Sequence, residues 1–195
     1  MSGAGAIRVC KTPAARPPAL PGKPSRRAVL AALSAAPFAR AAAGDDAFLE
    51  DLSHRSFRML WEQADPATGL VLDRARTDGS HEPRSANIAS IAATGFSLSG
   101  ICIAAERKWI PPRRAADRVR VALRAFDGQI ENQHGWFYHF LDVTTGRRAW
   151  KCEVSSMDTA LLLCGVLTAR QYFHHDSEIA KLAAPGFQLT TARKR

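Results

Sequence analysis

Two acidic residues flank a pair of serines late in the chain: Glu153 lies two residues before Ser155, and Asp158 lies two residues after Ser156. Paired carboxylates can share acid and base work on a bound substrate, because each can hold or release a proton near a reacting bond. Ser155 can cap a helix that starts at Ser156, which places Asp158 in the first turn, near the positive end of the helix dipole. The spacing predicts two carboxylates at the mouth of a pocket.

The helix that these residues begin is almost wholly apolar over residues 160–167, so we expect it to be buried on all sides. Residues 85–106 form a second long run, rich in Ala, Ser, Gly and Ile, which predicts another buried helix. A membrane span is the competing interpretation of this run, but Asn87 and five Ser or Thr residues interrupt it. Cys102 and Cys164 lie inside these two runs and are expected to be small core residues.

Two other segments have the spacing of helices with one apolar face, residues 45–64 and residues 113–126. In the second, Ala116, Val119, Leu123 and Phe126 form the apolar stripe, and Pro111-Pro112 fits the start of a helix. The order along the chain is therefore amphipathic, buried, amphipathic, buried. A double ring of helices gives this alternation, with the polar loops gathered at the N-terminal ends of the inner helices.

The connection before the last buried helix, residues 127–154, is long. Within it residues 136–142 are aromatic and typical of a β-strand, and Thr144-Thr145-Gly146 is typical of a turn. Residues 147–152 are therefore expected to pair back on residues 136–142 as a hairpin.

The N-terminal segment, residues 1–43, has seven Lys or Arg residues and no acid, a short apolar run, and small residues at its end. This layout, with Arg26-Arg27 before the apolar run, is typical of a twin-arginine export signal and predicts a periplasmic or secreted protein. The segment accounts for all but two of the nine net positive charges, so the charge does not indicate a nucleic-acid partner. A disordered basic arm is the alternative interpretation. No metal-ligand spacing, phosphate loop or cofactor motif is present.

Several motifs in order resemble the glucoamylase-like domain family, which includes bacterial endo-β-1,2-glucanases and is related to the transglycosylating domain of cyclic β-1,2-glucan synthases. They are Asp73-Arg74, residues 85–95, residues 137–142, residues 145–147 and above all residues 153–162. The resemblance implies an (α/α)6 barrel that hydrolyses glucans with inversion. It also implies a glucan or oligosaccharide as the partner, and we expect no cofactor. Because the apolar run of the signal is too short to span a bilayer and residues 85–106 are interrupted, no membrane span is expected after signal removal.

On this resemblance, Glu153 and Asp158 are the candidate catalytic carboxylates, with acid and base roles open; Asp158 has the alternative of a capping residue. The candidate substrate-binding residues are Asp73, Arg74, Trp136, Tyr138, His139, Asp142 and Ser156. Several have structural alternatives: Asp73 and Arg74 as an ion pair, Asp142 as the first residue of a turn, and the aromatic residues as core.

The chain departs from the family in length, because such a barrel needs six helix pairs and residues 44–182 supply about two. Residues 183–195 have no family character, which suggests a truncated or frame-shifted product. Three hypotheses stay open: a β-1,2-glucan hydrolase by descent, an inactive fragment that binds glucan or self-associates through an exposed apolar edge, and an exported helical protein without carbohydrate function.

Overall fold

The computed structural model describes residues 43–76, 78, 80 and 85–184. The predicted export signal lies outside these residues except for Ala43, and so does the tail from residue 185 onward. The described chain is mostly helical with two small antiparallel sheets, which confirms the expected fold class at this coarse level. The elements in chain order are α2 (Ala43–Glu62), β1 (Ile88–Ser90), α3 (Ile91–Glu106), α4 (Pro112–Gly128), β2 (Asn132–Gln133), β3 (Trp136–Phe137), β4 (Phe140–Asp142), α5 (Ser156–Tyr172) and α6 (Ser177–Leu182).

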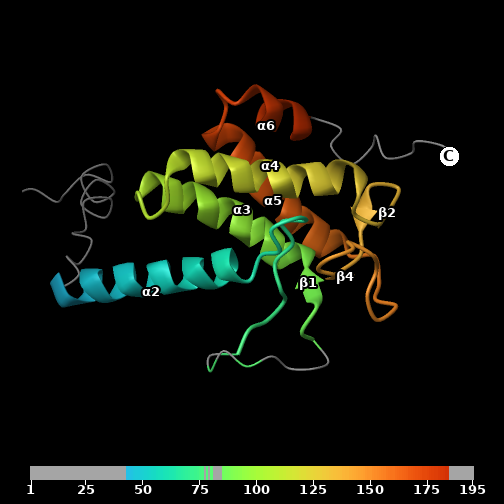
Figure 1. The fold of residues 1–195 in the computed structure, drawn as a ribbon, viewed down its shortest axis with the longest axis horizontal. Helices are drawn as coiled ribbons and strands as arrows, with labels where there is room; N and C mark the ends of the chain where they lie inside the picture. The colour runs from blue at the N-terminus through green and yellow to red at the C-terminus, as the bar shows by residue number, and fades with distance from the viewer. Residues whose placement is uncertain (1–42, 77, 79, 81–84, 185–195) are drawn as a thin grey trace, which may run out of the picture. The chain divides into compact units, whose positions relative to one another are not determined.

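The two most apolar helices, α3 and α5, pack closely on each other, and α2 and α4 both contact α3 (Figure 1). Gly95 of α3 and Gly165 of α5 face each other where the two backbones approach. A Cβ atom on Gly165 would lie 2.1 Å from the carbonyl oxygen of Gly95, so neither helix has room there for a side chain. This contact fixes how closely α3 and α5 approach each other.

Helix α4 forms as its sequence predicts. It begins with Pro112 in its first turn, where the missing proline N–H costs no helical hydrogen bond. Its predicted apolar residues are all buried: Ala116, Val119, Leu123 and Phe126. The Phe126 ring meets Phe137 of β3 edge to face, with ring centroids 5.0 Å apart. Helix α4 thus joins the strands to the helical core.

The predicted helix over residues 85–106 is wrong in its first six residues. Residues 85–87 form a turn, β1 follows, and α3 starts only at Ile91. Strand β1 pairs with β4, and the Ser90 hydroxyl then accepts a hydrogen bond from the Ala93 amide as the helix cap. A partner strand distant in sequence therefore overrides the helical propensity of this segment.

The expectation that α3 and α5 are buried on all sides is also wrong. Met157 and Leu167 on α5 are 75% and 57% exposed, and Phe96 and Ile103 on α3 are 56% and 51% exposed. Helix α5 packs against α3 on one side, and no described helix covers its opposite side to a comparable extent. Cys164 lies on this exposed side, against expectation, whereas Cys102 is buried, and burial raises the pKa of its thiol to about 12.

The predicted hairpin forms in part, and its first segment also pairs with other strands. Residues 136–142 divide into β3, which pairs with β2, and β4, which pairs with β1. Of the expected pairing, an antiparallel bridge between Leu141 and Arg148 forms, with backbone hydrogen bonds from the Asp142 amide to the Arg147 carbonyl and from the Ala149 amide to the Phe140 carbonyl. Residues 143–145 make the predicted turn. The β2–β3 hairpin closes through His134 and Gly135, both with positive φ, as two-residue hairpin turns require.

We expect Asp176 to be the main anchor of α6. Its carboxylate accepts hydrogen bonds from the Glu178 and Ile179 amides and lies 2.6 Å from the Arg120 guanidinium of α4. Asp176→Ala should lower the free energy of unfolding by about 1–2 kcal/mol in a urea titration, because it removes both the cap and the cross-helix partner. Asp176→Asn is the matched variant: it keeps the cap and should lose less than half as much. Equal losses would mean that the cap contributes nothing.

Candidate functional site

Three backbone hydrogen bonds hold the N-terminal ends of α3 and α5 at one place. The Ile91 amide, at the start of α3, donates to the His139 carbonyl over 3.4 Å, and the His139 amide donates to the Glu153 carbonyl over 3.1 Å. The Ser155 amide, at the α5 cap, donates to the Phe137 carbonyl over 3.0 Å. The loop that carries His139 is therefore fixed between the starts of the two helices.

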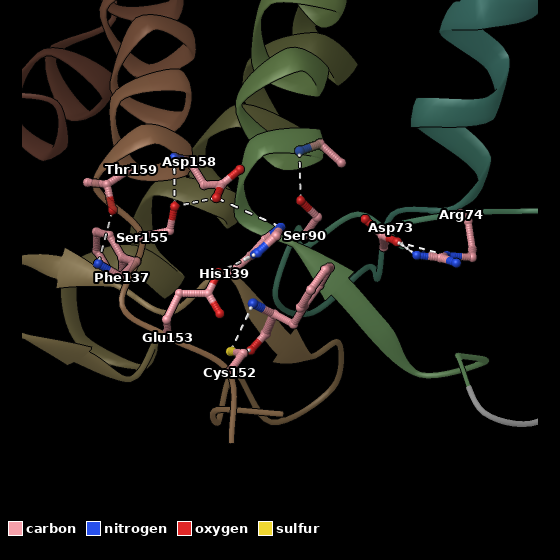
Figure 2. A network of polar contacts seen from close by, with 12 residues as sticks. Asp73, Arg74, Ser90, Phe137, His139, Cys152, Glu153, Ser155, Asp158 and Thr159 are labelled. Atoms are coloured by element: carbon pink, nitrogen blue, oxygen red, sulfur yellow. Dashed lines mark hydrogen bonds and ion pairs between the residues drawn. The ribbon is translucent and has the colours of Figure 1, made fainter. Parts of the chain in front are cut away.

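The side chains of His139, Glu153 and Asp158 form one polar cluster at this place (Figure 2). The imidazole Nδ1 lies 3.0 Å from a Glu153 carboxylate oxygen, and Nε2 lies 3.8 Å from a carboxylate oxygen of Asp158. Glu153 is the more open carboxylate, with its side chain 67% exposed, against 29% for His139 and 17% for Asp158. The imidazole ring therefore lies between the two predicted catalytic carboxylates.

Asp158 has the capping position that its spacing predicts. The Ser155 hydroxyl accepts a hydrogen bond from the Asp158 amide over 3.2 Å and also contacts the Asp158 carboxylate. The Asp158 carboxylate also contacts the His139 imidazole. The capping and site alternatives are thus compatible, because one carboxylate makes both contacts.

Glu153 is held in its charged form. Hydrogen bonds from its own backbone N–H and from the His139 ring lower the pKa of this carboxyl, and the positive charge of Arg148 adds to the effect. A carboxyl with a lowered pKa is a poor proton donor near neutral pH but can accept a hydrogen bond or a proton from a ligand. Of the two open roles, that of base or acceptor fits Glu153.

The Glu153 carboxyl should titrate below its ordinary value of 4.5 in the folded protein, as followed by the 13C chemical shift of its carboxyl carbon. Because the pKa is lowered on folding, the associated stability is present above the unfolded pKa and is lost as pH falls through the folded pKa. His139→Ala should move the midpoint part of the way back towards 4.5, since the backbone hydrogen bond stays. An unchanged midpoint in this variant would show that the imidazole contact is not formed in solution.

The other predicted binding residues do not all join this cluster. Asp73 and Arg74 lie near the same end of α3, where the Asp73 amide bonds to the β1 carbonyl of Ile88, but their side chains pair with each other at 2.6 Å (Figure 2). Asp142 caps its own turn, since its carboxylate accepts from the Thr144 and Thr145 amides. For these three residues the structural alternatives hold in the described conformation.

The remaining candidates differ in exposure. Trp136 on β3 is 48% exposed, and Ser156, the first residue of α5, is exposed at the helix end. Tyr138 is half buried: its backbone makes a bridge with Val154, and the Arg148 guanidinium lies 4.6 Å from the centre of its ring.

Sequence reasoning missed Arg148 and Cys152, which shape the loop before Glu153. The Arg148 guanidinium donates to the Lys151 and Cys152 carbonyls over 2.6 and 2.5 Å, and the Cys152 sulfur accepts from the Phe140 amide over 3.3 Å. Hydrogen bonds from a side chain to backbone carbonyls follow no sequence pattern. The position of Arg148 in the loop that leads to Glu153 was the one sequence feature that could have indicated its role. The described residues contain no group of three or more side chains placed to hold a metal ion, and none of their helices meets both the length and the hydropathy needed to cross a membrane.

Comparison with known proteins gives similarity to β-1,2-glucan hydrolases over about 70% of the chain. A curated sequence relative is the exo β-1,2-glucooligosaccharide sophorohydrolase of Parabacteroides distasonis, 28% identical over 142 residues, which are 70% of this chain and 19% of the relative. Among solved structures, the endo-β-1,2-glucanase of Chitinophaga pinensis, determined with sophorotriose and glucose, has a TM-score of 0.66 at 23% identity. A β-1,2-glucanase of Parabacteroides distasonis has a TM-score of 0.61 at 26% identity. No family model matches the chain.

The similarity covers only part of each relative. The chain matches 35% of the Chitinophaga glucanase and 20% of the Parabacteroides glucanase, while 74% and 71% of the chain itself is covered. The resemblance expected from the sequence motifs is confirmed, and the described fold corresponds to about a third of the Chitinophaga enzyme.

Proposed function

We propose that this protein acts on β-1,2-linked glucans by hydrolysis with inversion, with the cluster of His139, Glu153 and Asp158 at the substrate site. The observation that carries the proposal is the pair of carboxylates on opposite sides of one imidazole at the start of α5. Sequence similarity to a hydrolase named for β-1,2-glucooligosaccharides supports the choice of linkage.

In this proposal Glu153 is the base that accepts a proton from the attacking water, because its side chain is open to solvent and its lowered pKa keeps the carboxylate deprotonated and able to accept. Asp158, the second carboxyl group, is then the acid that protonates the leaving glycosidic oxygen. An inverting reaction needs its two carboxyl groups about 6.5–9.5 Å apart, with a water between the sugar and the base. Since the imidazole now fills the space between the carboxylates, His139 has to turn aside when substrate binds.

The test is incubation of the purified protein with linear β-1,2-glucan, with β-1,3-glucan as the matched control polymer. We expect release of short oligosaccharides from the first polymer only, and proton NMR of the fresh products should show the α-anomer first. Release of the β-anomer would contradict inversion, and no release at high protein concentration would contradict hydrolysis.

Binding without hydrolysis is the second candidate function, and the position of His139 favours it. The ring contacts both carboxylates in the free protein, and the same three groups can accept and donate hydrogen bonds to sugar hydroxyls. Saturable binding of β-1,2-gluco-oligosaccharides without product release would support this function. An absence of both binding and release would support an exported helical protein without carbohydrate function.

Export and self-association belong to the same proposal. Export rests on the basic, apolar and small-residue layout of residues 1–43. Self-association rests on an apolar cavity of about 780 Å³ between α2 and α3, whose lining includes the exposed side chains of Phe96 and Ile103. Detection of the intact chain in the cytoplasmic fraction would contradict export. A monomer at every protein concentration in analytical ultracentrifugation would contradict self-association.

A further inference from the structure

The turn that leads to Glu153 has a strained backbone. Trp150 and Lys151 both have positive φ, 53° and 55°, and neither is the glycine that normally occupies this region. Bulky residues adopt this conformation only where the surrounding structure holds them, and such strain collects at ligand-binding sites. The turn therefore needs specific contacts to keep its shape.

Arg148 supplies those contacts from inside the turn. Its guanidinium donates to the Lys151 carbonyl over 2.6 Å and to the Cys152 carbonyl over 2.5 Å, so it bonds two successive peptide units. Its own amide donates to the Glu131 carboxylate over 2.8 Å, and its guanidinium lies over the Tyr138 ring. Arg148 thus links the strained turn to Tyr138 through its side chain and to Glu131 through its backbone amide.

The strained turn holds the indole ring of Trp150 at the surface. Trp150 is 55% exposed, and its ring meets Phe140 at 5.3 Å between centroids with an interplanar angle of 62°. Phe140 stacks on the His139 imidazole at 3.7 Å, and that imidazole contacts the Glu153 carboxylate. A continuous aromatic series therefore leads from an exposed indole to the polar cluster.

We propose that Trp150 is a stacking platform for the apolar face of a glucosyl ring, adjacent to the ring held by the polar cluster, and that Arg148 is its positioning residue. An indole offers a flat apolar surface with a polar edge, which matches a pyranose ring that is apolar on its faces and hydroxylated at its rim. Strain held in the free protein sets the indole in place before the sugar arrives, so less ordering accompanies binding. This inference rests on the proposed glucan function and names one further contact for it.

The experiment is calorimetric titration of the full chain with β-1,2-gluco-oligosaccharides of two to five units. Trp150→Ala should weaken the longer ligands about tenfold and the disaccharide less, while Trp150→Phe keeps most of the affinity. Phe48→Ala, which removes an exposed ring on α2, is the matched control and should change nothing. Equal affinities for wild type and Trp150→Ala would overturn the platform alone, whereas a wild-type protein that binds none of the ligands would overturn both the platform and the glucan function.

Arg148 is tested by a double-mutant cycle. Arg148→Gln should weaken the longer oligosaccharides as Trp150→Ala does, and the double variant should be no weaker than either single variant, because both remove one platform. Arg55→Gln, which breaks an exposed pair on α2, is the matched control. If Arg148→Gln instead weakened binding through a general loss of structure, its effect on affinity would add to that of Trp150→Ala. Additive losses of affinity in the double variant would therefore overturn the positioning role.

Discussion

Gly165→Ala should destabilise the protein by about 3 kcal/mol or more, measured as the free energy of unfolding in urea. The added Cβ would lie 2.1 Å from the Gly95 carbonyl oxygen and 2.7 Å from its carbon, and both are backbone atoms that cannot rotate away. The helices α3 and α5 would have to separate, and overpacking of this kind costs about 1–3 kcal/mol even where side chains can adjust. Gly95→Ala should act in the same way, since its Cβ would lie 2.5 Å from the Leu161 carbonyl oxygen.

Gly100→Ala is the matched control in the same helix as Gly95. Its Cβ would meet the Leu60 side chain at 3.5 Å, an ordinary van der Waals contact. Alanine is a better helix former than glycine by about 0.5–1 kcal/mol, so this variant should be neutral or more stable. If Gly165→Ala were as stable as Gly100→Ala, the close approach of α3 and α5 would be wrong.

Glu153→Gln should reduce oligosaccharide release from β-1,2-glucan by about 100-fold or more, in line with the usual contribution of a general base. Glutamine keeps the size of the side chain and a carbonyl oxygen for a hydrogen bond to His139, but it cannot take up a proton. The rate loss should therefore appear mainly in kcat, while KM changes little.

Glu62→Gln is the control for this prediction, because Glu62 is an exposed carboxylate that pairs with Arg58 on α2. It should retain full activity and stability. If Glu153→Gln kept wild-type kcat, Glu153 would not be the base; if it instead raised KM at constant kcat, its part would be restricted to holding the sugar.

The order of helices and the position of the carboxylates could be predicted from the sequence because they depend on local rules. Ser155 caps α5 as expected, since a serine followed by a helical run can satisfy the first free amides in only a few ways. Pro112 begins α4 because the first helical position needs no N–H donor and suits the fixed φ of proline. The motifs around Glu153 also gave the resemblance to β-1,2-glucan hydrolases that sequence and structural comparison then showed.

Local rules failed where a distant segment decides the outcome. The sequence could not indicate that residues 88–90 leave the helical pattern to pair with residues 140–142, nor that α5 has one exposed side. The sequence also did not indicate the hydrogen bonds from Arg148 to two backbone carbonyls, because the presence of an arginine in a loop does not reveal which groups it bonds.

The sequence by itself determined the order of the four long helices, the start of α5 at Ser156, and that two carboxylates lie near one helix end. Only the tertiary structure decided that His139 lies between them and that Trp150 and Phe140 extend the site outward. The physical reason is that caps and apolar periodicity act over a few residues, whereas the β1–β4 pairing and the Gly95–Gly165 contact join segments 50 or more residues apart.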